Sequence, residues 1–295
     1  MRPLFPAPIR ERSRVTRVWL IGAMALLGAA TAHAGQVGSP KPAPAVGYTL
    51  VSRETIEARL GAAPRNNQDR EPAIESMFEQ AGCKGSDLVE QPVKHERFPN
   101  VICHVAGSTD STIIVGAHFD KVSRGGGVVD NWSGASLLTS LFESLHDRPR
   151  KHTFIFVSFT AEEEGLVGSK FYVSRMTPDD IARTRAMVNI DTLALGTTNI
   201  WLTHSDRKLA GAFYAVAQSM KLPVAIVNAD HVGNDDSDSF LRRKVPTLML
   251  HSITNRTFHV LHTDDDNLSA VRFGDYYDSY RLIAAYLAWI DTVLD

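Results

Sequence analysis

A histidine and two aspartates surround a glycine-rich segment in the first half of the chain. Residues 112–117 are apolar and rich in β-branched side chains, which predicts a buried strand, and this strand leads directly into His118 and Asp120. The glycines at 125–127 permit backbone turns that other residues avoid, and Asp130 follows them. Imidazole and carboxylate groups spaced in this way could bind a metal ion, but taken alone they fit an ordinary surface loop equally well.

Similar groups follow three later predicted strands. They are Glu162, Glu163 and Glu164 after 153–159, Asp191 after 186–190, and His262 between 246–250 and the last helix. In a parallel sheet the carboxyl ends of the strands share one edge, where loops and helix starts converge to bind ligands. We therefore expect two histidines and three carboxylates to meet at that edge. Such a set without thiolates suits zinc or another divalent cation, and a central carboxylate suits two ions that share a bridging aspartate.

The elements that position these groups alternate between strands and helices. Strands are predicted over 100–106, 112–117, 153–159, 186–190, 200–203 and 246–250, and helices over 55–60, 71–80, 134–146, 166–174, 207–220 and 270–294. This alternation predicts an α/β fold, a three-layer α/β/α sandwich with a mixed, mainly parallel central sheet. The turn-forming segment 107–111 also predicts that the first two strands form a hairpin.

The chain has 295 residues, which is enough for one large α/β domain with a substantial core. In its first 34 residues, five arginines precede an apolar run at 18–30, and the AHA sequence at 32–34 resembles a cleavage site, which is typical of a secretory signal peptide. The run is shorter than the roughly 20 residues that span a bilayer, so a retained anchor is the weaker interpretation. We expect a Pro- and Ala-rich tether over 35–47 and a folded domain over 48–295. The mature protein is then expected to be secreted or periplasmic, without a stable membrane anchor.

Charge and cysteine content narrow the classes of partner. Beyond residue 34 the chain has 26 basic and 32 acidic residues, a net charge near −6, which argues against nucleic acid or an anionic membrane as a partner. The two cysteines, Cys83 and Cys103, do not have the CxxC spacing of a zinc thiolate site. In an exported protein they could form a disulfide, and the alternative is two separate buried thiols.

Five segments carry a resemblance to a known family. They are HFD at 118–120, DNWSGAS at 130–136, AEEEGLVGS at 161–169, NIDTLALG at 189–196 and LHTDDDN at 261–267. In this order and at these separations they resemble the secreted bacterial leucyl-type zinc aminopeptidases of peptidase family M28. The resemblance extends from about residue 101 to the end of the chain. It implies the zinc exopeptidase-like fold, which is a form of the sandwich expected above.

The resemblance also assigns the metal ligands. It implies that His118 and Asp191 bind one zinc ion and that Glu163 and His262 bind a second one. Asp130 matches the aspartate that bridges the two ions. The cofactor implied is therefore two Zn²⁺ ions per chain.

The implied reaction is the hydrolysis of N-terminal residues from peptides that have a free amino terminus. A water shared by two zinc ions becomes acidic enough to lose a proton near neutral pH. Glu162 matches the general base, which would take this proton and pass it to the leaving amine. Asp120 matches the aspartate that orients the ligand histidine.

Some of these assignments have competitors within the sequence. The three adjacent glutamates at 162–164 are assigned by their register against the AEExGL pattern of the family, which leaves the third as a helix-start residue. His259 competes with His262, which is favoured because HTDDDN matches the family's HTxxD segment. The segment DDSDSFLRRKVP at 235–246 resembles one that lines the site in this clan, and Asp236 within it is either near the site or a plain helix cap.

Two other functions compete with the aminopeptidase. A glutaminyl cyclase is related, has the same fold and uses a single zinc ion to close an N-terminal glutamine into a ring. Those enzymes resemble each other in having tryptophan where this chain has Leu261, and AEEEGLVGS lacks their longer insertion. The second alternative is a metal-free binding protein on the same scaffold, but such a protein would have lost one or more of the five ligands or the base.

Overall fold

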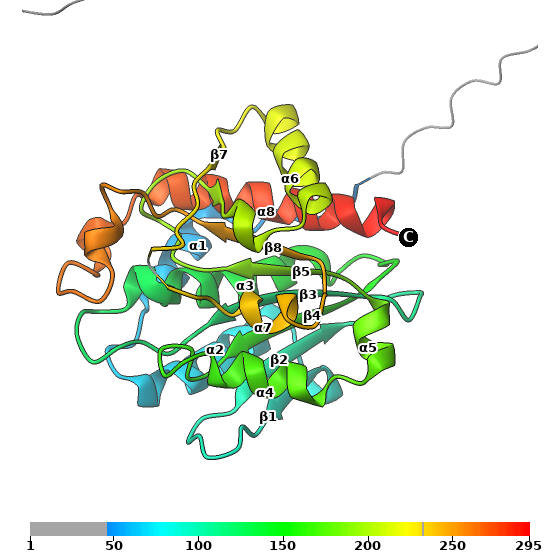
Figure 1. Ribbon diagram of the computed structural model, residues 1–295, viewed down its shortest axis with the longest axis horizontal. Coiled ribbons are helices and arrows are strands. Elements are labelled where there is room, and N and C mark those ends of the chain that lie inside the picture. The colour runs from blue at the N-terminus through cyan, green and yellow to red at the C-terminus, as the bar shows by residue number, and fades with distance from the viewer. Residues whose placement is uncertain (1–45, 232) are drawn as a thin grey trace, which may run out of the picture. The chain divides into compact units, whose positions relative to one another are not determined.

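The computed structural model describes residues 46–231 and 233–295 (Figure 1). The predicted signal peptide and nearly all of the predicted tether lie outside these residues. None of the helices in the described ranges combines the length and the apolar character of a membrane span.

The described part of the chain alternates between strands and helices, as expected. The strands are β1 Leu88–Gln91, β2 Asn100–Val105, β3 Thr112–His118, β4 Thr153–Phe159, β5 Thr184–Ile190, β6 Asn199–Ile200, β7 Ala225–Ile226 and β8 Thr247–His251. The α-helices are α1 Arg53–Gly61, α2 Asn67–Ala81, α3 Ser133–Leu145, α4 Val167–Arg175, α5 Pro178–Arg183, α6 Arg207–Met220, α7 Ser237–Leu241 and α8 Phe273–Val293.

The strands form one sheet in the order β1-β2-β4-β3-β5-β8-β6-β7. The four central strands β4, β3, β5 and β8 are parallel to one another. Antiparallel pairs join β1 to β2, β2 to β4, and β6 to β8. The sheet is therefore mixed and mainly parallel at its centre, which confirms the predicted fold class.

Helices cover both faces of the sheet (Figure 1). The larger core packs α1, α2, α3, α6 and α8 against one face, and a smaller core packs α4, α5 and α7 against the other. Because successive side chains in a strand point to opposite faces, Ile113 and Val115 of β3 enter the larger core and Ile114 enters the smaller one. Such two-sided burial explains why β3 reads as a continuous apolar run.

The predicted hairpin between the first two sequence-predicted strands is wrong. β2 does run antiparallel to β3, but β4 lies between them and pairs with both. The segment 107–111 instead packs on the chain that leads into β4, where Ser108 N donates to Arg150 O at 2.8 Å and Thr153 N donates to Ser111 O at 3.0 Å. A Cβ at Gly107 would lie 2.3 Å from the backbone of His152, so this close approach requires glycine.

The two cysteines form a disulfide between Cys83, just after α2, and Cys103 on β2. Gly82 ends α2 in the left-handed conformation, with a φ of +107°, and turns the chain toward the sheet. The disulfide therefore ties the end of an outer helix to a strand, as expected for the bridged alternative.

Candidate active site

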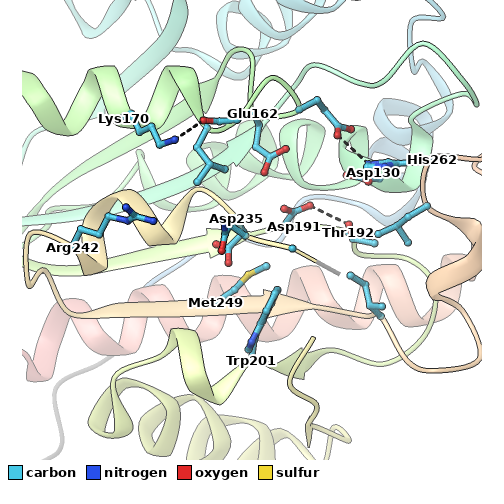
Figure 2. Close-up of a pocket in the computed structure, with 17 residues that line it drawn as sticks. Asp130, Glu162, Lys170, Asp191, Thr192, Trp201, Asp235, Arg242, Met249 and His262 are labelled. Carbon is cyan, nitrogen blue, oxygen red and sulfur yellow. Dashed lines mark hydrogen bonds and ion pairs between the residues drawn. The ribbon is translucent and has the colours of Figure 1, made fainter. Parts of the chain in front are cut away.

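Four parallel strands deliver the candidate residues to one edge of the sheet. His118 is the last residue of β3, and Asp191 directly follows β5. Glu162 lies three residues after the end of β4, and His262 lies in the irregular segment after β8. Figure 2 shows Glu162, Asp191 and His262 around one cavity, together with Asp130 from the loop after β3. The sequence-predicted ligands are thus brought together by the carboxyl ends of neighbouring strands.

Asp130 lies between the two histidines. Its Oδ1 is 3.4 Å from His118 Nε2, which is also 3.5 Å from Asp191 Oδ1. Its Oδ2 is 3.2 Å from His262 Nε2, which is also 3.0 Å from Glu163 Oε2. The five residues therefore form two groups of potential metal-binding atoms that share Asp130.

The spacing of these atoms fits a pair of divalent cations. Zinc binds nitrogen and oxygen ligands at about 2.0–2.2 Å, so the ligand atoms of a tetrahedral site lie roughly 3.3–3.6 Å apart. The distances from His118, Asp130 and His262 to their neighbours, 3.0–3.5 Å, are close to this spacing. In addition, Glu163 Oε1 is buried and has no hydrogen-bond partner among the described residues. Because buried polar atoms are almost always paired, this oxygen is available to a cation.

The charges of the histidines and of Asp130 depend on one another. Burial opposes protonation of His118, but the carboxylates of Glu162 and Asp191 outweigh it and raise the His118 pKa well above its ordinary value. Hydrogen bonds with Asp130 and Glu163 raise the pKa of His262 to about 10. Burial alone would raise the pKa of Asp130, but its hydrogen bonds with the two histidines hold it well below the usual range. Divalent cations would supply the same positive charge and displace the histidine protons.

Burial disfavours the charged form of the remaining carboxylates. Burial raises the pKa of Glu162 well above its ordinary value, and the nearby Asp236 and Asp191 carboxylates oppose the lowering effect of His118. Burial also raises the pKa of Asp191 and that of Glu163. A glutamate with a raised pKa can both take and return a proton near neutral pH, so the environment of Glu162 is compatible with acid–base chemistry.

Asp120 connects the end of β3 to the glutamates after β4. Its Oδ1 accepts a hydrogen bond from Glu162 N at 3.0 Å, and its Oδ2 accepts one from Glu163 N at 3.2 Å. The same carboxylate lies 3.6 Å from His118 Nδ1, and its backbone oxygen is nearer to that nitrogen, at 3.2 Å. In this structure the Asp120 carboxylate thus holds the glutamate backbone, whereas the Asp120 backbone oxygen makes the hydrogen bond with His118.

Arg70 of α2 is a fully buried cation beside the site, and sequence reasoning missed it. Its Nη1 donates to Phe119 O at 2.9 Å, and its Nη2 donates to Gly126 O at 2.7 Å and to Gly127 O at 2.9 Å. Its Nε donates to Pro64 O at 3.2 Å. Burial lowers the Arg70 pKa to about 10, so the guanidinium remains charged at neutral pH. Arg70 therefore holds together both ends of the loop that joins the first histidine to the shared aspartate.

Asp266 joins the loop of the second histidine to the shared aspartate. Its Oδ1 accepts from Val129 N at 2.7 Å and its Oδ2 accepts from Asp130 N at 3.3 Å. Its backbone oxygen also accepts from Gly126 N at 2.7 Å. Burial raises the pKa of Asp266 to about 6. The sequence signal for this role is the HTxxD pattern, which places Asp266 four residues after His262.

Asn131 joins the same loop to the end of β5. Its Nδ2 donates to Ile190 O at 2.9 Å, and its Oδ1 accepts from Thr192 N at 3.1 Å and from Gly134 N at 2.9 Å. A Cβ on Gly134 would lie 2.5 Å from Ile190 O. The start of α3 can therefore approach β5 only because residue 134 is glycine.

Three non-glycine residues at the site adopt the left-handed conformation. Ala161, Thr192 and His262 have φ values of +51°, +55° and +59°. The first two lie next to a candidate base or ligand, and the third is itself a candidate ligand. Such conformations are uncommon and cluster at functional sites, where the surrounding structure maintains them.

The segment 235–241 contributes a second polar network. His204 Nδ1 lies 2.6 Å from Asp235 Oδ2, and Asp235 Oδ1 accepts from Asn189 Nδ2 at 3.0 Å and from Ser237 N at 2.8 Å. The His204 ring stacks on Trp201 with 4.1 Å between ring centroids. This network fixes Asp235 and Trp201, both of which line the cavity.

Asp236 and the competing histidines take different positions. Asp236 occupies the N-cap position of α7, but its side chain makes no capping hydrogen bond there. It is buried, neither of its carboxylate oxygens has a hydrogen-bond partner among the described residues, and burial raises its pKa to about 8. His259 is exposed, and buried His251 lies with its Nε2 2.7 Å from Val227 O. Neither belongs to the two groups around Asp130.

The cavity has a volume of about 280 Å³. Its wall is lined by the acidic groups of the site and by the apolar side chains of Trp201, Met249, Ile253 and Leu261. An acidic surface beside an apolar one can receive a positively charged group next to a hydrophobic side chain.

Comparisons with known proteins place these residues in context. A family model described as Peptidase family M28 matches residues 100–287, which is well over half of the chain. The probable leucine aminopeptidase 2 of Aspergillus oryzae is 30% identical over 117 residues, which cover 39% of this chain and 24% of that protein. The matched part therefore spans only about a quarter of that relative.

Solved structures show the same fold. The LapA aminopeptidase of Legionella pneumophila has a TM-score of 0.70 and 19% identity, over 82% of this chain and 71% of that one. A glutaminyl cyclase from an Acidobacteriales bacterium has a TM-score of 0.68 and 16% identity, over 86% of this chain and 99% of that one. At these identities the likeness concerns the fold and does not choose between the two activities.

Proposed function

Because the chain belongs to peptidase family M28, we propose that it is a zinc-dependent aminopeptidase that holds two zinc ions and removes N-terminal residues from peptides. The observation that carries this proposal is the position of Asp130, which directs one carboxylate oxygen to each of two histidine-containing groups. His118 and Asp191 complete one ligand set, and Glu163 and His262 complete the other. The assignment is supported by the spacing of the ligand atoms and by the unpaired Glu163 Oε1.

Glu162 is the proposed general base and acid. When bound, the zinc ions would lower the pKa of a water and polarise the scissile carbonyl. Glu162 lies on the cavity wall with its carboxylate 3.9 Å from His118 Nε2, and it is not a member of either ligand group. It takes a proton from the attacking water and returns it to the leaving amine. Asp120 fixes the backbone of Glu162 and thereby the position of that carboxylate.

The proposed substrates are peptides with a free amino terminus. Asp191 and Asp235 place negative charge in the wall of the cavity, which would attract a protonated or metal-facing amine. The apolar wall formed by Met249, Ile253 and Leu261 would receive the side chain of the first residue. An acylated amino terminus has lost the positive charge that this wall favours, so the reaction is expected to be an exopeptidase reaction.

A glutaminyl-peptide cyclotransferase that uses a single zinc ion is the second candidate. It is kept because a glutaminyl cyclase has the same fold, over 86% of this chain and 99% of the cyclase. Against it, two complete ligand groups share Asp130, whereas a single-zinc enzyme needs only one such group. The number of bound ions therefore distinguishes the two candidates.

The test combines metal content with hydrolysis. The purified protein is dialysed against zinc and its bound zinc is measured, and a panel of aminoacyl p-nitroanilides is assayed with and without chelator. The expected result is about two zinc ions per chain and chelator-sensitive cleavage of free aminoacyl substrates but not of their Nα-acetyl analogues. One ion per chain with cyclisation of glutaminyl peptides would transfer the assignment to the cyclase. No zinc and no reaction would contradict both.

We also infer export from residues 1–34. Five arginines, an apolar run and an AHA sequence support cleavage just before residue 35. Mass spectrometry of the expressed protein in its native type of host is expected to find an N terminus at or near residue 35 outside the cytoplasm. Intact chain that begins at Met1 in the membrane fraction would contradict this inference.

A further inference from the structure

The cavity carries two cationic side chains that the proposed mechanism does not use. Lys170 extends from α4 and Arg242 directly follows α7, and both line the cavity. Figure 2 shows them on the same side of the cavity, across from Asp130 and His262. The cavity therefore has the candidate metal ligands at its acidic end and the two cations at the other end, with Asp235 between them.

Neither cation is paired with an acidic group. No Asp or Glu side chain in the described ranges lies within 4.0 Å of the Lys170 or Arg242 nitrogen atoms. Lys170 Nζ donates only to the backbone oxygen of Gly165, at 2.8 Å, and Arg242 is exposed. The charges of Arg242 and Lys170 both lower the pKa of Asp238. This side chain lies nearer to His204, however, with 3.6 Å between Asp238 Oδ1 and His204 Nδ1. Both cationic groups are thus free to bind an anion from the substrate.

The size of the cavity limits what this anion can belong to. Its volume of about 280 Å³ is just below the range for ligand pockets, roughly 300–1,000 Å³. An extended peptide advances about 3.3 Å per residue, so a substrate whose amine lies at the acidic end extends beyond the pocket after a few residues. A very short peptide would instead keep both of its ends inside the cavity.

We propose that Lys170 and Arg242 form a carboxylate-binding subsite and that the preferred substrates are short peptides, dipeptides above all. The amine of such a peptide lies at the acidic end, and its terminal carboxylate lies between the two cations. A carboxylate on the side chain of the second residue has the same chemistry and is the other possible source. This inference rests on the proposed aminopeptidase function, because it assumes that the scissile bond lies between the two ends.

The experiment compares substrates that differ only in the carboxylate. The zinc-loaded enzyme is assayed with Leu-Gly and with Leu-Gly-amide, and the ratio of the two kcat/KM values is the readout. One charge-assisted contact at a partly solvated site is expected to favour Leu-Gly about tenfold. The ratio should fall as salt is raised from low to high concentration, because solvent-exposed charges are screened. A second pair, Leu-Glu-amide and Leu-Gln-amide, shows whether a side-chain carboxylate can take the same place.

A matched pair of double variants assigns the effect to the two cations. In Lys170→Gln/Arg242→Gln the ratio is expected to fall to near one. The control Arg207→Gln/Lys208→Gln removes the same charge from the exposed start of α6, where neither residue lines the cavity, and it should keep the wild-type ratio. A salt-independent ratio, or the same loss in both double variants, would contradict the subsite.

The outcomes separate this inference from the proposed function. If the zinc-loaded enzyme cleaves leucine p-nitroanilide but treats Leu-Gly and Leu-Gly-amide alike, and Leu-Glu-amide and Leu-Gln-amide alike, only the carboxylate subsite is refuted. If no unblocked substrate is cleaved, the aminopeptidase function fails and the subsite fails with it. A preference for Leu-Glu-amide that disappears in Lys170→Gln/Arg242→Gln would support the subsite and assign it to the side chain.

Discussion

Replacing Arg70 by methionine tests whether a buried cation outside the ligand set organises the metal site. Arg70 lies in α2, before the part of the chain that matches the family model. It contacts the backbone on both sides of the loop that joins the candidate ligands His118 and Asp130. We expect Arg70→Met to weaken zinc binding as well as to lower stability, because the methionine fills the space but leaves the loop unanchored.

The magnitude follows from the four carbonyl contacts. They span 2.7–3.2 Å, and a hydrogen bond to a charged group contributes about 1.5–3 kcal/mol, part of which offsets the cost of burying the cation. The substitution leaves the carbonyls of Phe119 and Gly127 buried without this donor. We therefore expect the free energy of unfolding of the metal-free protein to fall by about 3–5 kcal/mol. Zinc affinity should fall by about 10–100-fold, as when residues that support metal ligands are replaced.

The assay needs a control for destabilisation alone. Arg150 is also buried, donates to Leu145 O at 2.7 Å, and precedes the amino end of β4, the opposite end of that strand from the site. Urea unfolding of the metal-free proteins gives the stability of Arg70→Met and Arg150→Met. Competition with a chromophoric chelator, at a temperature where each variant is folded, gives the zinc dissociation constants. Only Arg70→Met should change those constants.

Two results would refute this reasoning. One is an Arg70→Met protein that is destabilised yet binds zinc within about twofold of the wild type. The other is an Arg150→Met protein that loses zinc affinity to the same extent. Arg70→Lys provides a second measurement if Arg70→Met does not fold. Lysine keeps the charge but cannot span the same carbonyls, so the zinc affinity of Arg70→Lys should be lower than that of the wild type.

Three further predictions concern other parts of the molecule. Glu162→Gln should retain zinc but lose at least about 10²-fold in kcat, whereas Asp130→Asn should lose zinc, and equal metal loss in both would reverse the roles of base and ligand. Burial lowers the pKa of His251 to about 4, below its unfolded value near 6.5. The free energy of unfolding of the wild type should therefore fall by up to about 3 kcal/mol as the pH is lowered from 6.5 to 4. Urea unfolding midpoints of His251→Gln should lack this dependence on pH. Replacing Cys83 and Cys103 by serine opens a closed loop with a sequence separation of 20 and should lower the unfolding free energy by about 3 kcal/mol, and unchanged thermal unfolding would contradict this.

The ends of the parallel strands were the part of the site that the sequence could predict. A strand buried on both faces appears as an apolar run, so the polar residue that ends it marks the sheet edge. His118 and Asp191 could be placed at that edge from this pattern alone, and the folded chain brings them within 3.5 Å of each other. The roles of base and ligand needed the family pattern, because Glu162 and Glu163 are adjacent and chemically identical.

Strand order and short elements could not be predicted in the same way. The hairpin prediction failed because β2 and β3 are close in the chain and joined by a turn-forming segment, whereas the strand between them, β4, comes later. The local pattern predicts that β2 and β3 run in opposite directions, but it does not show that a later strand lies between them. The strands β1 and β7 were missed since each has four residues or fewer, too few to show a period.

The charge balance of the site was hidden from the sequence for a different reason. Arg70 lies in α2 but precedes the helix that the sequence predicts at 71–80, and no spacing rule relates it to His118. Its importance depends on backbone carbonyl groups, which have no sequence signature. Asp266 likewise acts on the amide of Asp130 from the loop that carries His262. Because each ligand loop is held by a residue from another segment, displacing one loop should disturb the ligands of both groups, so the two zinc ions are expected to bind cooperatively.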